Sequence, residues 1–319
     1  MQIKTIKSVL AKKIKAWADS ISDPAVKKIV EEQTIVTGGA IASMLMQEPV
    51  NDFDVYFRTG EGAFAVAQYY VNKMNEAREK PKCEGVHVPL FITDWAEKKP
   101  LTKYDGKRFI IMAKSAGVAE ETQAGEYQYF EATDPEGTRA EAYLDDVKAA
   151  ADQKASEAKN EYRPIFLSSN AITLSDKIQI VIRFFGEPEQ IHENYDFVHC
   201  KCSWTSWDKK LDTPQEALHA MMSKTLHYVG SLYPVCSVIR TRKFIQRDWR
   251  ITAGQYLKMA FQISNLNLRD VRVLEDQLTG VDSAFFAQLI SIVRKDVEEG
   301  KKPEDIDVTY IAQLVDRIF

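Results

Sequence analysis

The segment between residues 34 and 57 constrains the fold of this chain more strongly than any other. A β-branched run, Thr34 to Thr37, ends in the pair Gly38-Gly39, and helix formers without a breaker follow in residues 40–47. The next run, NDFDVYF at residues 51–57, alternates polar and apolar side chains as a half-buried strand does. The sequence therefore predicts the order strand, Gly-Gly, helix, strand, within an α+β fold.

Two carboxylates lie in the second of these predicted strands. Asp52 and Asp54 are two residues apart, so in a strand they project from the same face and repel each other unless a cation lies between them. Mg²⁺ prefers oxygen ligands and usually keeps positions for a substrate phosphate. Upstream, Gly38 and Gly39 open a helix whose free N–H groups suit a phosphate, and Ser43 adds a hydroxyl one turn later. The pattern predicts a phosphoryl-transfer site that uses metal ions.

The rest of the chain is predicted to complete one core and to add a second domain. Helical spacing predicts helices over about residues 5–31 and 61–79. Three β-rich runs, IFLSSNAITLS, KIQIVIRFF and NYDFVHCKCSW, are predicted strands, with a short helix in GEPEQIHE between the last two. From about residue 214 the apolar spacing is helical. We expect a core at residues 1–208, an insertion at about 85–162 that holds short strands such as RFIIMAK, and a helical C-terminal domain at 209–319.

Charge and cysteine content exclude several function classes. With 42 Lys and Arg against 46 Asp and Glu, the net charge of −4 gives no field that would coat a nucleic acid or an anionic membrane, so a nucleic-acid contact needs a local patch. No apolar run approaches the roughly 20 residues of a membrane-spanning helix, and the basic N-terminus lacks the apolar stretch of a secretion signal. We expect a cytoplasmic protein without a membrane partner, whose four cysteines are reduced. They are Cys83, Cys200, Cys202 and Cys236.

The Gly38-Gly39 pair followed by Asp52-Phe53-Asp54 resembles the motif of the nucleotidyltransferase superfamily typified by DNA polymerase beta. That superfamily has a mixed sheet with flanking helices and a third carboxylate on a later strand. The best match for this carboxylate is Asp196 in Tyr195-Asp196-Phe197, with Asp176 as the substitute. The chain is also similar to phage-encoded members of the superfamily, in which a run like NAITLSDKIQIVIRF precedes one like YDFVHC. A phage origin would place the protein in the host cytoplasm.

The resemblance implies a reaction and a set of roles. Asp52 and Asp54 would bind two Mg²⁺ ions, and Asp196 would bind the catalytic metal and help to deprotonate the acceptor hydroxyl. Gly38, Gly39 and Ser43 would hold the triphosphate of the NTP substrate. The reaction would move an NMP from the NTP to an acceptor hydroxyl and release pyrophosphate.

The acceptor is left open by the sequence. QRDWRITA at residues 246–253 is similar to a motif of tRNA-CCA-adding enzymes, and this likeness implies that Arg247 contacts the NTP. A helix through VIRTRKFIQRDWRI would align four cations as a stripe that suits an RNA backbone. RNA is therefore the first choice, with a protein or small-molecule hydroxyl as the alternatives. The cations are Arg240, Lys243, Arg247 and Arg250.

Three other interpretations are weaker. TIVTGGAIAS resembles the start of a short-chain dehydrogenase, but Ser43 and Leu45 stand where the further glycines would be. A zinc site at the histidines and cysteines of residues 192–202 is disfavoured because strand alternation divides them between two faces, so packing roles are favoured. A nucleotidyltransferase fold retained as an inactive binding or structural protein is the main rival. The three intact carboxylate candidates, Asp52, Asp54 and Asp196, disfavour it, because an abandoned site has no reason to keep a repelling pair.

Overall fold

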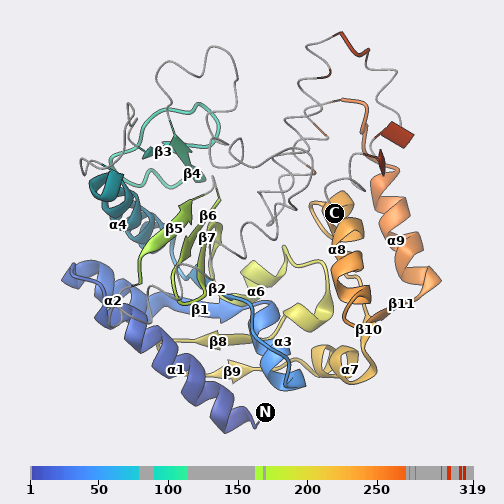
Figure 1. Ribbon diagram of the computed structural model, residues 1–319, viewed down its shortest axis with the longest axis horizontal. Helices are drawn as coiled ribbons and strands as arrows, with labels where there is room; N and C mark the ends of the chain where they lie inside the picture. Colours follow the sequence, from blue (N-terminus) through green and yellow to red (C-terminus); the bar gives the residue numbers. More distant parts are fainter. Residues whose placement is uncertain are drawn as a thin grey trace. The chain divides into compact units, whose positions relative to one another are not determined.

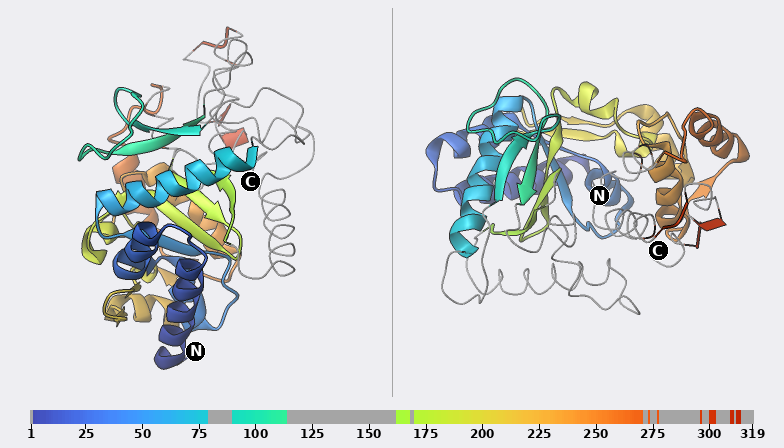
Figure 2. Two further views of the ribbon diagram at one scale, coloured as in Figure 1. Left: turned by 90° about the vertical axis from the view of Figure 1, so that its left-hand side faces the viewer. Right: turned by 90° about the horizontal axis from the view of Figure 1, so that it is seen from above.

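The computed structural model describes residues 2–78, 90–113, 162–167 and 170–270, together with residues 273, 277, 296, 300–302, 309–310 and 312–313. The described residues divide into two compact units, the first ending at Ser223 and the second beginning at Lys224. Most of the predicted insertion, and most of the chain after residue 270, where helices are also predicted, lie outside the described residues. Figures 1 and 2 show the described elements coloured along the chain.

The first unit begins with two helices rather than the single long helix predicted over residues 5–31. Helix α1 spans Ile3–Asp19 and α2 spans Pro24–Gln33. The break occurs because Asp23 caps α2, accepting hydrogen bonds from the N–H groups of Ala25 and Val26, and Pro24 fits only at a helix start.

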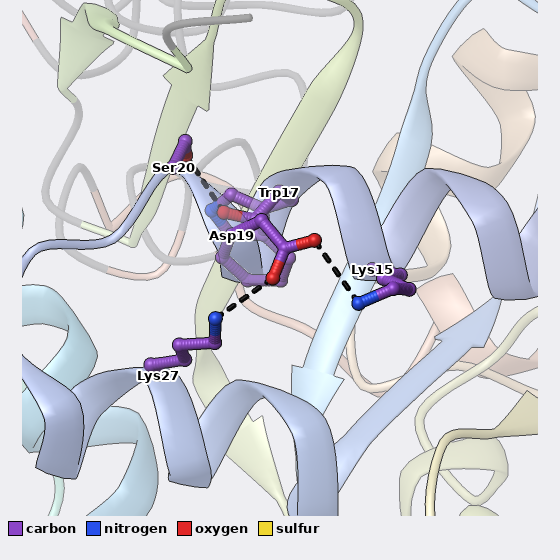
Figure 3. Close-up of polar contacts among 5 residues, drawn as sticks. All are labelled: Lys15, Trp17, Asp19, Ser20 and Lys27. Atoms are coloured by element: carbon purple, nitrogen blue, oxygen red, sulfur yellow. Dashed lines mark hydrogen bonds and ion pairs between the residues drawn. The ribbon is translucent and has the colours of Figure 1, made fainter.

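Asp19, the last residue of α1, makes one ion pair within its own helix and one with α2. The Asp19 carboxylate lies 3.1 Å from Lys15 Nζ and 2.7 Å from Lys27 Nζ, and Ser20 Oγ donates to the Trp17 carbonyl (Figure 3). The hydrogen bond from Lys27 is the main cause that lowers the pKa of Asp19. Since these charges are exposed, they contribute little to the stability of the fold.

A seven-stranded mixed sheet forms the centre of the first unit (Figure 1). The predicted strand–helix–strand segment folds as β1 (Thr34–Thr37), α3 (Gly39–Met46) and β2 (Phe53–Phe57). The strand order is β5-β6-β7-β2-β1-β8-β9, and among these neighbours only β2 and β7 are parallel. The other strands of this sheet are β5 (Pro164–Leu167), β6 (Ala171–Leu174), β7 (Ile178–Phe185), β8 (Ser203–Thr205) and β9 (Leu211–Asp212).

Apolar side chains cover both faces of this sheet. On one face Trp17 of α1 packs against Phe57, with ring centroids 6.3 Å apart, and donates a hydrogen bond to Tyr70 of α4 (Gly60–Arg78). On the other face Ile191 of α6 (Pro188–His192) packs with Ile35, Tyr56 and Val181. The strands are thus buried between helices, and the predictions of α4 and of a short helix at α6 are confirmed.

The run NYDFVHCKCSW is not the predicted strand. Phe197 makes a single bridge, Val198–Cys200 forms the 3₁₀ helix η1, and regular strand structure begins only at Ser203 in β8. Phe197 and Val198 are buried in the core of the first unit. Their apolar side chains are therefore explained by packing and do not require a strand. Helix α7 (Gln215–Ser223) closes the first unit.

Two strands of the predicted insertion are described. They are β3 (Leu90–Asp94) and β4 (Phe109–Ala113), which pair antiparallel, and β4 confirms the strand expected in RFIIMAK. Asp94 closes the connecting loop by accepting hydrogen bonds from the backbone N–H groups of Glu97 and Lys99.

The second unit mixes helices with two short strands, whereas the sequence predicts helices alone. Helices α8 (Pro234–Ile245) and α9 (Ala253–Ile263) pack with a parallel pair, β10 (Thr225–Leu226) and β11 (Arg250–Ile251). Strands of two residues are too short to produce a periodic pattern, so the sequence could not reveal them. Among the described helices of both units, none has the length and apolar character to cross a membrane.

Candidate phosphate and metal site

Gly38 forms a turn that only glycine adopts readily. Its φ of 87° and ψ of −150° lie in a region that side chains with a Cβ avoid. Its N–H donates to the Cys200 carbonyl at 3.1 Å, which fixes the turn to the end of η1. Helix α3 begins at the next residue, and no side chain caps it, whereas Asp23 caps α2. The first-turn N–H groups of α3 therefore suit a bound anion.

The Asp54 carboxylate lies directly beside this turn. A Cβ built on Gly38 would stand 2.8 Å from Asp54 Oδ2, closer than such atoms approach, whereas a Cβ on Gly39 would meet nothing within 4 Å. The register explains this proximity, because Asp54 of β2 pairs with Thr37, the residue before Gly38. The predicted carboxylate and the predicted phosphate-binding turn are therefore adjacent.

Asp54 lies between two polar neighbours in the sheet. Thr37 of β1 and Gln179 of β7 are level with it, and residues level with one another project from the same face. The strand β7, IQIVIRFF, contains no carboxylate. The position beside Asp54 on the parallel neighbour is thus held by an amide.

Asp52 and Asp196 are placed differently from Asp54. Asp52 is half-buried and immediately precedes β2, while Asp196 is 6% exposed in the bend between α6 and η1 rather than on a strand. Within the described ranges, no group of three or more His, Cys, Asp or Glu side chains is arranged to hold a metal ion. Asp52, Asp54 and Asp196 therefore do not form a three-carboxylate cluster.

Asp176, the substitute for Asp196, has a structural role. It lies in the turn between β6 and β7 with a positive φ of 60°, and its Oδ2 is 2.6 Å from Lys13 Nζ. Its side chain is 57% exposed. This pairing accounts for Asp176 without a metal.

Three further side chains surround the Gly38 turn. Thr37 Oγ1 donates to the Cys202 carbonyl at 2.8 Å, so its contact of 2.8 Å with His192 Nε2 requires the histidine to be the donor. The Tyr195 ring lies 5.3 Å from the His192 ring and 6.3 Å from the Tyr56 ring. The Cβ position of Gly38 is 3.6 Å from Tyr195 Oη.

Burial sets the protonation of these groups. Desolvation, with a smaller contribution from Lys201, lowers the pKa of His192 to about 4, so the ring is neutral at neutral pH. Desolvation also raises the pKa of Tyr195 well above its ordinary value, and the charge of Asp54 adds to this effect. The sequence did not indicate either role, because only the packing of α6 and η1 brings these residues to Gly38.

Ser43 and Arg247 are the two remaining predicted ligands. Ser43 is half-buried in α3, one turn after Gly39, and its carbonyl accepts a hydrogen bond from Glu48 N–H. Arg247 is exposed in the second unit, in the turn that follows α8. Since α8 ends at Ile245, only Arg240 and Lys243 share a helix, and the predicted stripe of four cations on one helix is wrong.

The donor set suits Mg²⁺ that arrives with a nucleotide. Mg²⁺ usually takes one or two carboxylates and completes its shell with waters and substrate phosphates, rather than with an all-protein cage. Asp52 and Asp54 are the residues that would supply the carboxylates, and because Gly38 has no Cβ its turn lies directly against Asp54. An ion held this way needs no third protein carboxylate.

Comparison with known proteins gives one family and several distant structures. Residues 8–224 match the family described as Gabija anti-defense 2 family protein. The protein Gabija anti-defense 2 of Bacillus phage SPbetaL7 is 20% identical over 144 residues, which are 44% of this chain and 33% of that protein. The chain thus spans about a third of the curated relative.

The solved structures that align with the chain are CCA-adding enzymes. The Thermotoga maritima enzyme complexed with tRNA aligns with a TM-score of 0.37 and 12% identity, over 90% of this chain and 53% of that one. The Bacillus stearothermophilus enzyme in complex with CTP gives 0.36 and 10%, over 83% and 50%. TM-scores of this size do not establish a shared fold. What the structure does confirm of the predicted fold class is a mixed sheet with flanking helices.

Proposed function

We propose, from the premise that the chain belongs to the Gabija anti-defense 2 family, that it is a phage nucleotidyltransferase that counters a host defence by modifying an acceptor. The family description supplies the biological role, and the site supplies the chemistry. The reaction moves an NMP from an Mg²⁺-bound NTP to an acceptor hydroxyl and releases pyrophosphate. It takes place in the host cytoplasm.

One observation carries this proposal. The Asp54 carboxylate and the uncapped start of α3 meet at Gly38, where no side chain fits. A metal-bound phosphate needs two kinds of protein group. The carboxylate offers an anionic oxygen to the metal, and the helix start that lacks a cap offers N–H donors to the phosphate.

In this proposal one set of residues binds the metal and another set binds the triphosphate. Asp52 and Asp54 would hold the metal, which would supply a positive charge to polarise the phosphate that is attacked. The first N–H groups of α3, from Gly39 onward, and the Ser43 hydroxyl orient the triphosphate. Thr37 and His192 hold the end of β1, and therefore Gly38, in place through their hydrogen bond.

The acceptor is to be identified by labelling. The full chain is incubated with each α-³²P NTP, Mg²⁺ and an extract of the host, and the RNA, protein and small-molecule fractions are counted separately. We expect label in the RNA fraction with the parent protein, loss of label with Asp54→Asn, and retention with Asp176→Asn. The last variant is the matched control, since it makes the same charge change at a carboxylate that pairs with Lys13.

The rival is a protein that counters the defence by binding alone, and the absence of a three-carboxylate cluster among the described residues favours it. A plating assay on cells that carry the Gabija defence separates the two. If the Asp54→Asn chain, folded and equally abundant, protects the phage as well as the parent does, binding suffices and the enzymatic proposal is overturned.

A further inference from the structure

The hydroxyl of Tyr195 is buried and has no hydrogen-bond partner of good geometry among the described residues, although the hydroxyls of Tyr56 and Thr37 lie close enough to influence it. Its polar neighbours include Thr37, Tyr56 and Asp54. The Thr37 hydroxyl is already committed, because it donates to the Cys202 carbonyl and accepts from His192. A buried hydroxyl without an acceptor is unfavourable, and few persist in folded proteins without a reason.

The position of this hydroxyl gives the reason. Tyr195 Oη and Asp54 Oδ2 both border the place where Gly38 has no Cβ, at 3.6 Å and 2.8 Å from that point. The uncapped first turn of α3 begins at the next residue. An oxygen anion placed at this turn would therefore lie among a metal-binding carboxylate, backbone N–H groups and a neutral O–H donor.

The tyrosine ring is held so that its hydroxyl can serve such a ligand. The ring packs against Tyr56 and His192, and His192 is fixed in turn by its hydrogen bond to Thr37. The aromatic contacts orient the side chain without using its hydroxyl. The ring contacts hold the side chain in place, and the hydroxyl is the group that would bind a ligand. Such an arrangement is expected of a side chain that is preorganised for binding.

We propose that Tyr195 is a nucleotide-binding residue whose hydroxyl donates a hydrogen bond to a phosphate oxygen of the NTP at the Gly38 turn. This role rests on the proposed function, because it takes the ligand of the same site to be a metal-bound nucleotide. It adds a donor that is far from the Gly-Gly and Asp-x-Asp segment in sequence and is brought to it by the fold.

The test is Tyr195→Phe, which keeps the ring and removes only the O–H. Binding is measured by calorimetry with Mg²⁺ and the α,β-methylene analogues of ATP, CTP, GTP and UTP, which resist cleavage between the α and β phosphates. We expect affinity for the bound analogue to fall about ten- to a hundredfold, the usual range for a hydrogen bond to a charged group. The thermal midpoint without nucleotide should stay unchanged or rise, because a buried donor without a partner has been removed.

Tyr70→Phe is the matched control. Tyr70 is also buried, but its hydroxyl accepts a hydrogen bond of 2.6 Å from Trp17 Nε1 on the opposite face of the sheet. This variant should lower the thermal midpoint and leave nucleotide affinity unchanged.

The outcomes separate the two proposals. Equal nucleotide affinity of Tyr195→Phe and the parent overturns the role of Tyr195 while the proposed function stands. A fall in thermal midpoint like that of Tyr70→Phe, with unchanged affinity, assigns Tyr195 a purely structural role and also overturns the inference. If the parent binds none of the four analogues, the proposed function itself fails, and the role of Tyr195 with it.

Discussion

At the scale of single residues, the two glycines of the motif differ in what the fold requires of them. Gly38 has a positive φ and would bring a Cβ to 2.8 Å from Asp54 Oδ2. Gly39 is the first residue of α3 and has open space at its Cβ position. The sequence could not rank them, since both match the motif equally well. The conformation shows that Gly38 is required by the backbone, whereas Gly39 leaves room for a ligand.

This difference predicts opposite effects on stability. Gly38→Ala should lower the free energy of unfolding by about 1–3 kcal/mol, because the backbone conformation and the contact with Asp54 are both unfavourable for alanine. Gly39→Ala should leave that free energy unchanged or raise it by up to about 1 kcal/mol, because alanine favours helix. Urea unfolding without nucleotide measures both variants. The reverse order would contradict the assignment of the turn to Gly38.

His192 predicts a dependence of stability on pH. Its pKa is about 4 in the folded protein and 6.5 ordinarily. As the pH falls from 6.5 to 4, the unfolded chain binds a proton that the folded chain does not, so the free energy of unfolding should fall across this window. His192→Gln should show a shallower decline in the same urea titrations, since glutamine does not titrate. Identical pH profiles for parent and variant would show that His192 is not buried in its neutral form.

At the scale of secondary structure, local sequence signals were sufficient to predict the elements that carry the motif. They were not sufficient to predict the elements that pack around it. The order β1, α3, β2 follows from a β-branched run, a glycine pair and an alternating run, all close in sequence. Asp23-Pro24 marked the break between α1 and α2, yet helical spacing on both sides suggested continuity. The strand predicted around Asp196 was wrong because its backbone bonds go elsewhere: the Cys200 carbonyl accepts from Gly38, and the Cys202 carbonyl from Thr37.

The pairing of β2 with β7 predicts a gain of metal affinity. Gln179 is level with Asp54, so Gln179→Glu should place a third carboxylate beside the pair. We expect Mn²⁺, as a spectroscopic substitute for Mg²⁺, to bind this variant at least tenfold more tightly than the parent in the absence of nucleotide. Gln215→Glu, an exposed change at the start of α7, controls for the added charge. Equal Mn²⁺ affinity of the two variants would place the metal away from Gln179.

At the scale of the whole molecule, the family match and the structural division nearly coincide. The match ends at residue 224, and the first unit ends at Ser223. The Gly-Gly and Asp-x-Asp segment therefore lies in the part that defines the family. The second unit carries Arg240 and Lys243 on α8, and the net charge of −4 gives the rest of the protein no general attraction for nucleic acid.

If the acceptor is RNA, the affinity for RNA should depend on salt concentration, and the cations of α8 should contribute to that dependence. RNA binding should weaken with salt, with a logarithmic slope of about −0.7 for each contacted phosphate of a single strand. Replacing Arg240 and Lys243 with alanine should flatten this slope, whereas alanine at Lys4 and Lys12 of α1, an equal change of charge, should not. Filter binding of labelled RNA between about 50 and 200 mM salt measures the slope. Labelling that is insensitive to salt would exclude RNA and leave a protein or small-molecule hydroxyl as the acceptor.

The most direct measurement follows the two ends of the nucleotide in parallel reactions with host extract. Nucleotidyl transfer predicts that label from α-³²P NTP enters the acceptor, while label from γ-³²P NTP appears in pyrophosphate in equal amount. Both signals should be lost in Asp54→Asn. Label from γ-³²P NTP in the acceptor, or parent-level transfer by Asp54→Asn, would contradict the account.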